Sequence, residues 1–146
     1  MPTLTMPGEA IFADTSGFLA LLDAGDRFHR QTAEIWTAIL DSEREIVTTD
    51  YVRLESWVLI QRRMGTDAVI AFSDAILPVC RVEIVGEEGF QRASSQWYPA
   101  KRRRLSLVDV TSFDCMRRLR IHRALAHDGH FREQGFRIPT EGKVWE

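Results

Sequence analysis

Four acidic residues spread along the chain are candidates for one shared metal site: Asp14, Glu55, Asp109 and Asp128. Clustered carboxylates are the ligands that a hard divalent cation such as Mg²⁺ requires. A cation held in this way lowers the pKa of bound water and neutralises charge on phosphate oxygens, so no serine, cysteine or histidine nucleophile is needed. These residues would therefore support metal-dependent hydrolysis of a phosphodiester.

Asp14 directly follows residues 11–13, an apolar run that predicts a buried strand. In sheets of parallel strands, sites form at the carboxyl ends of the strands. Aspartate is also a favoured N-cap, and a helix is predicted to open at Asp14-Thr15-Ser16. The two roles are compatible, so both stay open.

Glu55 lies on the apolar face of a helix predicted to end at about Met64, a face formed by Tyr51, Leu54 and Val58. A lone carboxylate rarely faces a core, because burial of an unpaired charge is costly. Either an ion pair with Arg53 or Arg62 compensates the charge, or a cation does.

Asp109 and Asp128 have structural explanations of their own. Ser106-Leu107-Val108-Asp109 matches a helix capping box, and Asp128 precedes Gly129, as in a plain turn. A first-turn aspartate nevertheless lies near a helix N-terminus, where negative charge is favoured and a metal can be shared. Four acids at element ends or on a buried face favour one common site.

The chain has 146 residues, of which 45% are apolar. This length suffices for one core but not for two ordinary domains, so we expect a single domain over residues 1–146. Residues 1–10 hold two prolines and a glycine, which predicts a flexible N-terminal segment. Cys80 and Cys115 form no close-spaced metal pattern, and we expect both to be buried.

The start of the chain lacks the features of a targeting or membrane segment. The first cationic side chain is Arg27, and the apolar stretch 11–22 is interrupted by Asp14. That stretch is also far shorter than the roughly 20 residues that span a bilayer. We therefore expect a cytoplasmic protein.

Charge is distributed unevenly, with a net charge of -7 over residues 1–100 and +5 over residues 101–146. The basic part begins with Lys101, Arg102, Arg103 and Arg104, shortly after Trp97 and Tyr98. Basic side chains bind phosphates and aromatic rings stack on bases, so this run is a candidate RNA contact. A solvated loop is the alternative.

Short β-prone runs alternate with helical patterns along the chain. Strands are predicted at 11–13, 46–47, 79–85, 121–126 and 136–138, and helices at about 14–22, 27–40, 50–64, 66–77, 86–96 and 106–119. This alternation is typical of a parallel sheet covered on both faces. The predicted fold class is α/β, a three-layer α/β/α sandwich with a central, mainly parallel sheet.

Four sequence blocks in this order resemble the PIN-domain family, and specifically the VapC-type ribonuclease toxins of type II toxin–antitoxin modules. The blocks are IFADTSGFLALLD (11–23), TTDYVRLESWVLI (48–60), LSLVDVTSFDCMRRL (105–119) and ALAHDGHFREQGF (124–136). The likeness extends over nearly the whole chain. Its departures are Asp114, where many relatives have an apolar residue, and Gly129, where many have a charged one.

The resemblance implies a PIN-like fold, an RNA substrate and Mg²⁺, with Mn²⁺ as a possible substitute. It places Asp14, Glu55, Asp109 and Asp128 as catalytic metal ligands, with Thr15 and Ser16 as supporting hydroxyls. Asp114 is five residues beyond Asp109, about 140° around the helix, so we assign the ligand role to Asp109.

The resemblance also implies a homodimer and a cognate antitoxin protein, whose peptide would lie in an apolar groove formed by residues 51–77. Trp57 and Phe72 are candidate anchors for that peptide, the alternative being that both are core residues. His127 and His130 flank Asp128, but without an evident partner they are interpreted as surface or packing residues.

Two other functions remain possible at this level. A catalytically inactive PIN-like module could bind RNA or protein, although the complete set of four acids argues against it. A metal-dependent phosphatase for small molecules is disfavoured, since the chain has no Gly-rich phosphate cradle and no Asp-x-Asp nucleophile pair.

Overall fold

A computed structural model describes residues 8–146, and its centre is a four-stranded sheet. The strands are β1 (Ile11–Ala13), β2 (Ile46–Thr49), β3 (Cys80–Glu83) and β4 (Arg123–Leu125). They pair in the order β3-β2-β1-β4, and every pair is parallel. The predicted central, mainly parallel sheet is confirmed.

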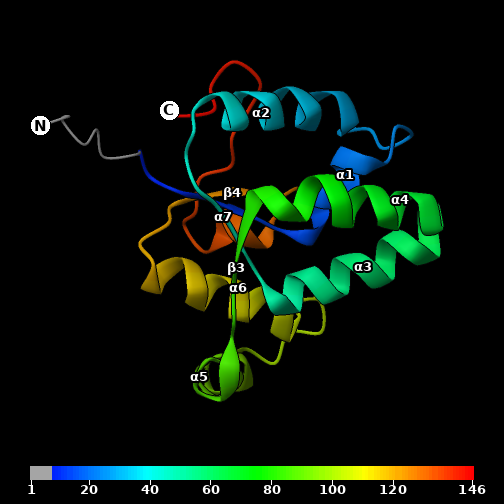
Figure 1. Ribbon diagram of the computed structural model, residues 1–146. Helices are drawn as coiled ribbons and strands as arrows, with labels where there is room; N and C mark the ends of the chain where they lie inside the picture. The colour runs from blue at the N-terminus through cyan, green and yellow to red at the C-terminus, as the bar shows by residue number, and fades with distance from the viewer. Residues whose placement is uncertain (1–7) are drawn as a thin grey trace, which may run out of the picture.

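Helices lie on both sides of this sheet. They are α1 (Thr15–Leu22), α2 (His29–Asp41), α3 (Asp50–Met64), α4 (Thr66–Ala71), α5 (Gly86–Ala100), α6 (Leu107–Arg118) and α7 (His130–Glu133). In Figure 1, α2 lies above the strands and α6 below them, with α5 beyond α6. The α3 and α4 helices run side by side away from the sheet. The predicted three-layer arrangement is confirmed.

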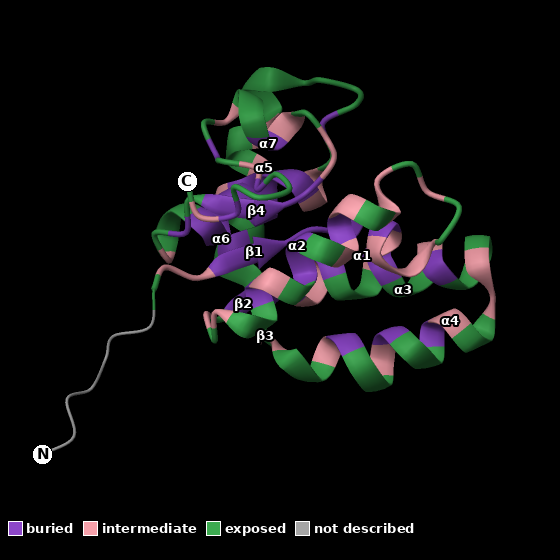
Figure 2. Cartoon of the chain, turned by 90° about the horizontal axis from the view of Figure 1, so that it is seen from above, coloured by how far each residue is buried: buried purple, intermediate pink, exposed green. Residues whose placement is uncertain are grey.

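Burial explains why the strands form where they do. All residues of β1, β2 and β4 are buried, as the continuous purple strands of Figure 2 show. Strands covered on both faces of a parallel sheet do not alternate between buried and exposed residues, and here Thr48, Thr49 and Arg123 are the buried polar residues of these strands. The edge strand β3 is only partly buried. The two central strands, β1 and β2, therefore anchor the core.

Several predicted boundaries shift in the structure. The helix expected at 66–77 ends as α4 at Ala71, followed by a π-helical segment η1 (Phe72–Ile76) and a 3₁₀ turn η2 (Leu77–Val79). The next strand is shorter than the predicted 79–85, whereas α5 continues beyond residue 96 to Ala100. Pro78 lacks a backbone N–H, which favours this change of winding.

The strand predicted at 136–138 is wrong. Only an isolated bridge joins Arg137 to Arg123, and the short helix α7 precedes it instead. Gly135 has a φ of 88°, which turns the chain. Phe136 then packs against the rings of Phe113 and Phe131. Packing of this aromatic ring, rather than strand pairing, accounts for the apolar run.

Part of the N-terminal segment predicted to be flexible, residues 1–7, lies outside the described residues. Glu9 accepts a hydrogen bond from the backbone N–H of His122 and forms an ion pair with Arg123. Of the cysteines, Cys115 is buried and Cys80 is half-buried, and both are free thiols. Within residues 8–146, no helix is long and apolar enough to cross a membrane.

Candidate active site

Close packing of α1 against β4 brings together two segments that lie far apart in the sequence. The backbone N–H of Asp14 donates to the carbonyl oxygen of Leu125 at 3.1 Å. A Cβ atom at Gly17 would collide with the same carbonyl oxygen, so only glycine permits this approach. The start of α1 is thereby held against the loop that carries Asp128.

Asp14 is the N-cap of α1 and is 3% exposed. Its carboxylate accepts hydrogen bonds from the backbone N–H of Ser16 at 3.1 Å and from the Ser16 hydroxyl at 2.7 Å. The Ser16 hydroxyl also accepts from the backbone N–H of His127 at 2.9 Å. The capping role of Asp14 is therefore confirmed, and the Ser16 hydroxyl ties its carboxylate to the loop that carries Asp128.

Asp109 is in the first turn of α6 and is 8% exposed. Its backbone N–H donates to the side chain of Ser106 at 3.0 Å, so Ser106 is the N-cap that the capping-box pattern predicts. The helix N-terminus fixes the backbone of Asp109 while its carboxylate extends toward Asp128. Again a structural role and a site role coincide in one residue.

Asp128, Asp109 and His130 form the compact centre of the site. Among the described residues, one ligand atom from each of these three side chains lies within 4.8 Å of the others. The Asp128 carboxylate accepts from the backbone N–H of His130 at 2.6 Å, which ties the Asp-Gly turn to the start of α7. From the sequence His130 was interpreted as a surface or packing residue, although its Asp-x-His spacing from Asp128 could have indicated its place in this centre.

The carboxylates are held close enough to affect one another's charge. The pKa of Asp14 is raised to about 7, chiefly by burial and further by the charges of Asp109 and Asp128. The pKa of Asp109 is raised to about 6 by burial and by the charge of Asp128. Hydrogen bonds from Ser16 and Ser106 act in the opposite direction. A divalent cation would relieve this repulsion, so the donor set fits one.

Glu55 is not part of that compact centre in the described structure, and no ion pair with Arg53 or Arg62 appears among residues 8–146 either. It is half-buried on α3. The hydroxyl of its neighbour Ser56 donates to the Thr15 hydroxyl at 3.0 Å. This contact places one turn of α3 beside the residue that follows Asp14. Of the two hydroxyls expected to support Asp14, Ser16 contacts its carboxylate, whereas Thr15 contacts Ser56.

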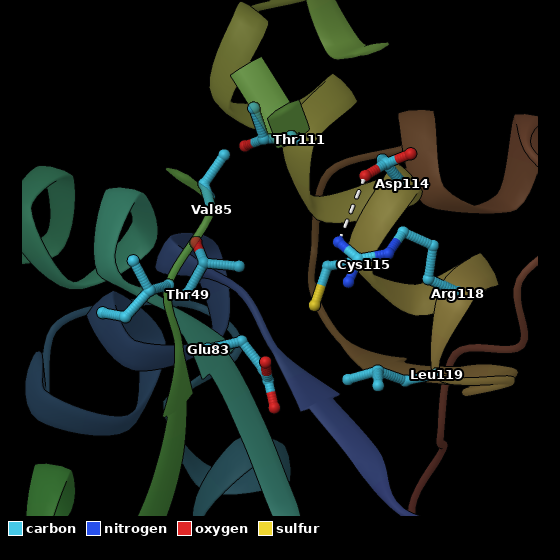
Figure 3. Close-up of a pocket in the computed structure, with 10 residues that line it drawn as sticks. Thr49, Glu83, Val85, Thr111, Asp114, Cys115, Arg118 and Leu119 are labelled. Carbon is cyan, nitrogen blue, oxygen red and sulfur yellow. Dashed lines mark ion pairs between the residues drawn. The ribbon is translucent and has the colours of Figure 1, made fainter. Parts of the chain in front are cut away.

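Asp114 lies on another face of α6, as its spacing from Asp109 predicts. Its carboxylate accepts from Arg92 on α5 at 3.1 Å and lies 3.8 Å from Arg118. Figure 3 shows Asp114 with Arg118 beside a small pocket that Cys115 also lines. Asp114 therefore joins α5 to α6, and both of its partners are cations of the chain itself.

The basic run after α5, residues 101–104, is linked through a residue of α7 to the compact centre of Asp109, Asp128 and His130, here called the acidic centre. All four residues from Lys101 to Arg104 are exposed, and Arg102 forms an ion pair of 2.9 Å with Glu133. The carboxylate of Glu133 lies 3.6 Å from His130. Positive side chains thus stand at the border of a negatively charged site.

Comparisons with known proteins show to which family the chain is similar. Residues 11–137 match the PIN domain family. The chain is 36% identical over 127 residues to the 23S rRNA-specific endonuclease VapC20 of Mycobacterium tuberculosis strain H37Rv, covering 86% of this chain and 95% of that protein. The VapC20 of strain CDC 1551 gives the same values.

Solved structures show the same relationship. The crystal structure of Mycobacterium tuberculosis VapC20, described as a sarcin-ricin loop cleaving toxin, has a TM-score of 0.78 and 35% identity, covering 87% of this chain and 96% of that one. FitAcB from Neisseria gonorrhoeae, 14% identical with a TM-score of 0.60, covers 88% of this chain and 95% of its own and shares the fold. The chain belongs to the PIN-domain family, whose members are metal-dependent nucleases, and the predicted resemblance to its VapC-type ribonucleases is confirmed.

Proposed function

We propose that this endoribonuclease uses Mg²⁺, for which Mn²⁺ substitutes, and that Asp14, Glu55, Asp109 and Asp128 are its catalytic metal ligands. The observation that carries the proposal is the grouping of Asp109 and Asp128 within 4.8 Å, with Asp14 close enough for its pKa to respond to both. Carboxylate oxygens suit Mg²⁺ and Mn²⁺, whereas imidazole suits softer metals. We therefore leave His130 outside the ligand set.

Glu55 belongs to the proposed set on the strength of the family resemblance. The Ser56–Thr15 hydrogen bond supports this assignment, because it holds that turn of α3 beside the segment carrying Asp14. Thr15 then fixes α3 relative to α1, while Ser16 fixes the Asp14 carboxylate directly. The two hydroxyls would position different ligands.

The bound cation would lower the pKa of a water molecule and neutralise charge on the scissile phosphate. Before substrate arrives, two hydrogen bonds already hold the carboxylates in place. The Ser16 hydroxyl donates to Asp14, and the His130 backbone N–H donates to Asp128. Lys101, Arg103 and Arg104 would contact the RNA backbone, and Arg102 would do so from its ion pair with Glu133. In-line attack would leave 5′-phosphate and 3′-hydroxyl ends.

We further propose that the substrate is ribosomal RNA and that the chain is the toxin of a toxin–antitoxin pair. The relative that is 36% identical over 95% of its length is named as specific for 23S rRNA. Base preference depends on the surface around the site, so the proposal extends to the class of RNA and not to the position of the cut.

The antitoxin would bind a groove of about 670 Å³ between α3 and η1, lined by Tyr51, Leu54, Trp57, Ser73 and Leu77. Trp57 is 39% exposed there, as expected of an anchor for a peptide. Phe72 is fully buried and packs edge-on against Phe18, so it is a core residue and its proposed role as an anchor is wrong.

The test is cleavage of purified ribosomal RNA by the purified protein with millimolar Mg²⁺, with and without chelator. Cleavage that stops in chelator and returns with Mg²⁺ or Mn²⁺ is expected. Mapping the new ends by primer extension distinguishes one cut within 23S rRNA from general degradation. Cleavage that persists in chelator would contradict the assigned metal chemistry.

A further inference from the structure

A second pocket opens directly beside the acidic centre. Its volume is about 160 Å³, and Asp128 lines it together with Phe28, Gln31, His127 and Arg132. These residues come from the start of α2, the loop after β4, and α7. Because Asp128 lines this pocket and also belongs to the acidic centre, an occupant of the pocket would adjoin the scissile phosphate.

One wall of the pocket is a stacked pair of aromatic rings. The rings of Phe28 and His127 lie 4.4 Å apart between centroids, with 2° between their planes. The guanidinium carbon of Arg27 lies 4.5 Å from the centroid of the Phe28 ring, outside the pocket lining. Such rings and guanidinium planes are the surfaces on which unpaired RNA bases stack.

The His127 ring and backbone are held by two neighbouring hydroxyls, those of Thr32 and Ser16, and Ser16 also supports Asp14. Nε2 of His127 lies 2.7 Å from the hydroxyl of Thr32, which is fully buried on α2. The His127 backbone N–H donates to Ser16, as described above. A ring held at both its side chain and its backbone loses little entropy when a ligand stacks against it.

Polar groups complete the lining. Gln31 offers an amide with donor and acceptor atoms, and the exposed Arg132 offers a guanidinium fork. The pocket is also smaller than the roughly 300–1,000 Å³ of sites for drug-sized ligands, which favours one planar ring system over a larger group. Aromatic wall, hydrogen-bonding groups and size together suit a single nucleobase.

We propose that the pocket formed by Phe28, Gln31, His127 and Arg132 receives an unpaired base of the RNA substrate, from the nucleotide next to the scissile phosphate. This inference rests on the proposed cleavage of RNA. It assigns Phe28 to substrate recognition and gives His127 a binding function in addition to packing. Sequence selection near the cut would then come from Gln31 and Arg132.

The experiment combines a change in the RNA with a change in the protein. A short RNA that the wild-type protein cleaves is prepared with one abasic nucleotide at each position around the cut. Removing the base that enters the pocket should slow cleavage about tenfold, since stacking on an aromatic side chain is worth about one such factor. Phe28→Leu should be slow on intact RNA and insensitive to the abasic change at that position only.

Binding without cleavage provides a second readout. Affinity of the Asp109→Asn protein for the same RNAs is measured in chelator by fluorescence anisotropy, and the same abasic position should weaken binding about tenfold. Adding Phe28→Leu or Arg132→Ala should remove that difference. The matched control is Phe90→Leu, an exposed phenylalanine on α5 that does not line this pocket.

The outcomes separate this inference from the proposed function. If the wild-type protein neither cleaves nor binds RNA, the proposed function fails. If it cleaves RNA but the folded Phe28→Leu and Arg132→Ala proteins show the same abasic profile as wild type, the base pocket is excluded and the nuclease assignment stands.

Discussion

Asp14 and Asp109 share an environment that favours their protonated forms. Burial and neighbouring carboxylates raise the pKa of Asp14 to about 7 and that of Asp109 to about 6. Near neutral pH Asp14 is partly protonated, and Asp109 gains its proton at slightly lower pH, so a cation must displace more protons and metal affinity should fall as pH falls. The same crowding makes the free energy of unfolding of the metal-free protein depend on pH.

Stability of the metal-free protein should decrease as pH rises from about 4 to 7. In this range the folded protein keeps a proton on Asp14 that the unfolded chain, with its ordinary pKa of 3.8, has lost. The free energy of unfolding should therefore drop by up to about 4 kcal/mol, from a shift of about three pKa units. Urea unfolding in chelator between pH 4 and pH 8 measures this slope.

Asp14→Asn should flatten most of that slope, whereas the exposed Asp41→Asn should leave it as in wild type. Addition of millimolar Mn²⁺ or Mg²⁺ at pH 7.5 should restore stability, because a ligand that binds only the folded state raises it. A wild-type slope in Asp14→Asn would mean that another group causes the pH dependence.

Asp109→Asn should reduce RNA cleavage by at least about 100-fold, since even groups one step removed from a metal contribute about 10- to 100-fold. The amide keeps the shape but lacks the charge that holds a cation. At pH 8 without metal the variant should melt no lower than wild type, because a buried carboxylate has been removed. Full activity in a folded Asp109→Asn protein would exclude Asp109 from the metal site.

At the scale of elements, the packing of α5 on α6 depends on a charged contact. Arg92 of α5 donates to Asp114 of α6 through both Nε and Nη2. Asp114 is nearly buried while Arg92 is partly exposed, so the contact is shielded on one side only. It fixes the helix whose C-terminal end leads into the basic run.

Arg92→Met should lower the free energy of unfolding, because it leaves the nearly buried carboxylate of Asp114 without its nearest cation. The control is Arg30→Met, which breaks an ion pair on α2 in which the arginine is 89% exposed, and it should cost less than about 0.5 kcal/mol. Urea unfolding compares the two.

Asp114→Asn, once folded, should cleave RNA at close to the wild-type rate, and complete loss of cleavage would overturn the assignment of Asp109 over Asp114.

Elements whose signals are local were predicted correctly from the sequence, whereas those that depend on tertiary contacts were not. The strand 11–13 and the helix ending at Met64 were predicted at their observed bounds, because burial on both faces and a Gly65 stop signal are local. The strand predicted at 136–138 was wrong because Phe136 packs with Phe113, 23 residues away, and no local pattern reports such a contact. The proximity of His130 to Asp109, 21 residues earlier in the chain, is likewise a tertiary contact that no local pattern reports.

At the scale of the whole molecule, the groove between α3 and η1 shares no lining residue with the compact centre of Asp109, Asp128 and His130. Trp57 also lines a pocket of about 290 Å³ together with Gln61 and Ile70. This side chain therefore belongs to the walls of both the groove and this pocket. Exposed apolar side chains gather there, among them Leu54, Val58 and Ile70. Such a surface is typical of a protein–protein contact.

Trp57→Ala should weaken binding of the cognate antitoxin by at least about 2 kcal/mol, or roughly 30-fold, while the fold is retained. Binding is measured by titration calorimetry with the purified partner, and circular dichroism checks the fold. Phe72→Ala should instead lower the melting temperature, because it empties a core position. Sedimentation of wild type and Trp57→Ala tests separately whether the predicted homodimer uses the same surface.

A folded Trp57→Ala protein that binds the antitoxin as tightly as wild type would remove the groove from the partner's binding site. In either case the variant should cleave RNA at the wild-type rate when antitoxin is absent, since Trp57 lines the groove and is not one of the proposed metal ligands.

The strand order has a consequence for how the protein is made. The central strand β1 is synthesised first, yet one of its two neighbours, β4, is synthesised last. Long-range parallel pairing of this kind forms slowly, because a long loop must close before any contact rewards it. Asp14 can therefore approach Asp128 only after the 114 residues that follow it have been synthesised. A nascent or truncated chain that stops before β4 holds no complete acidic centre, so a ribosome translating this message is not exposed to a working nuclease from its own unfinished product.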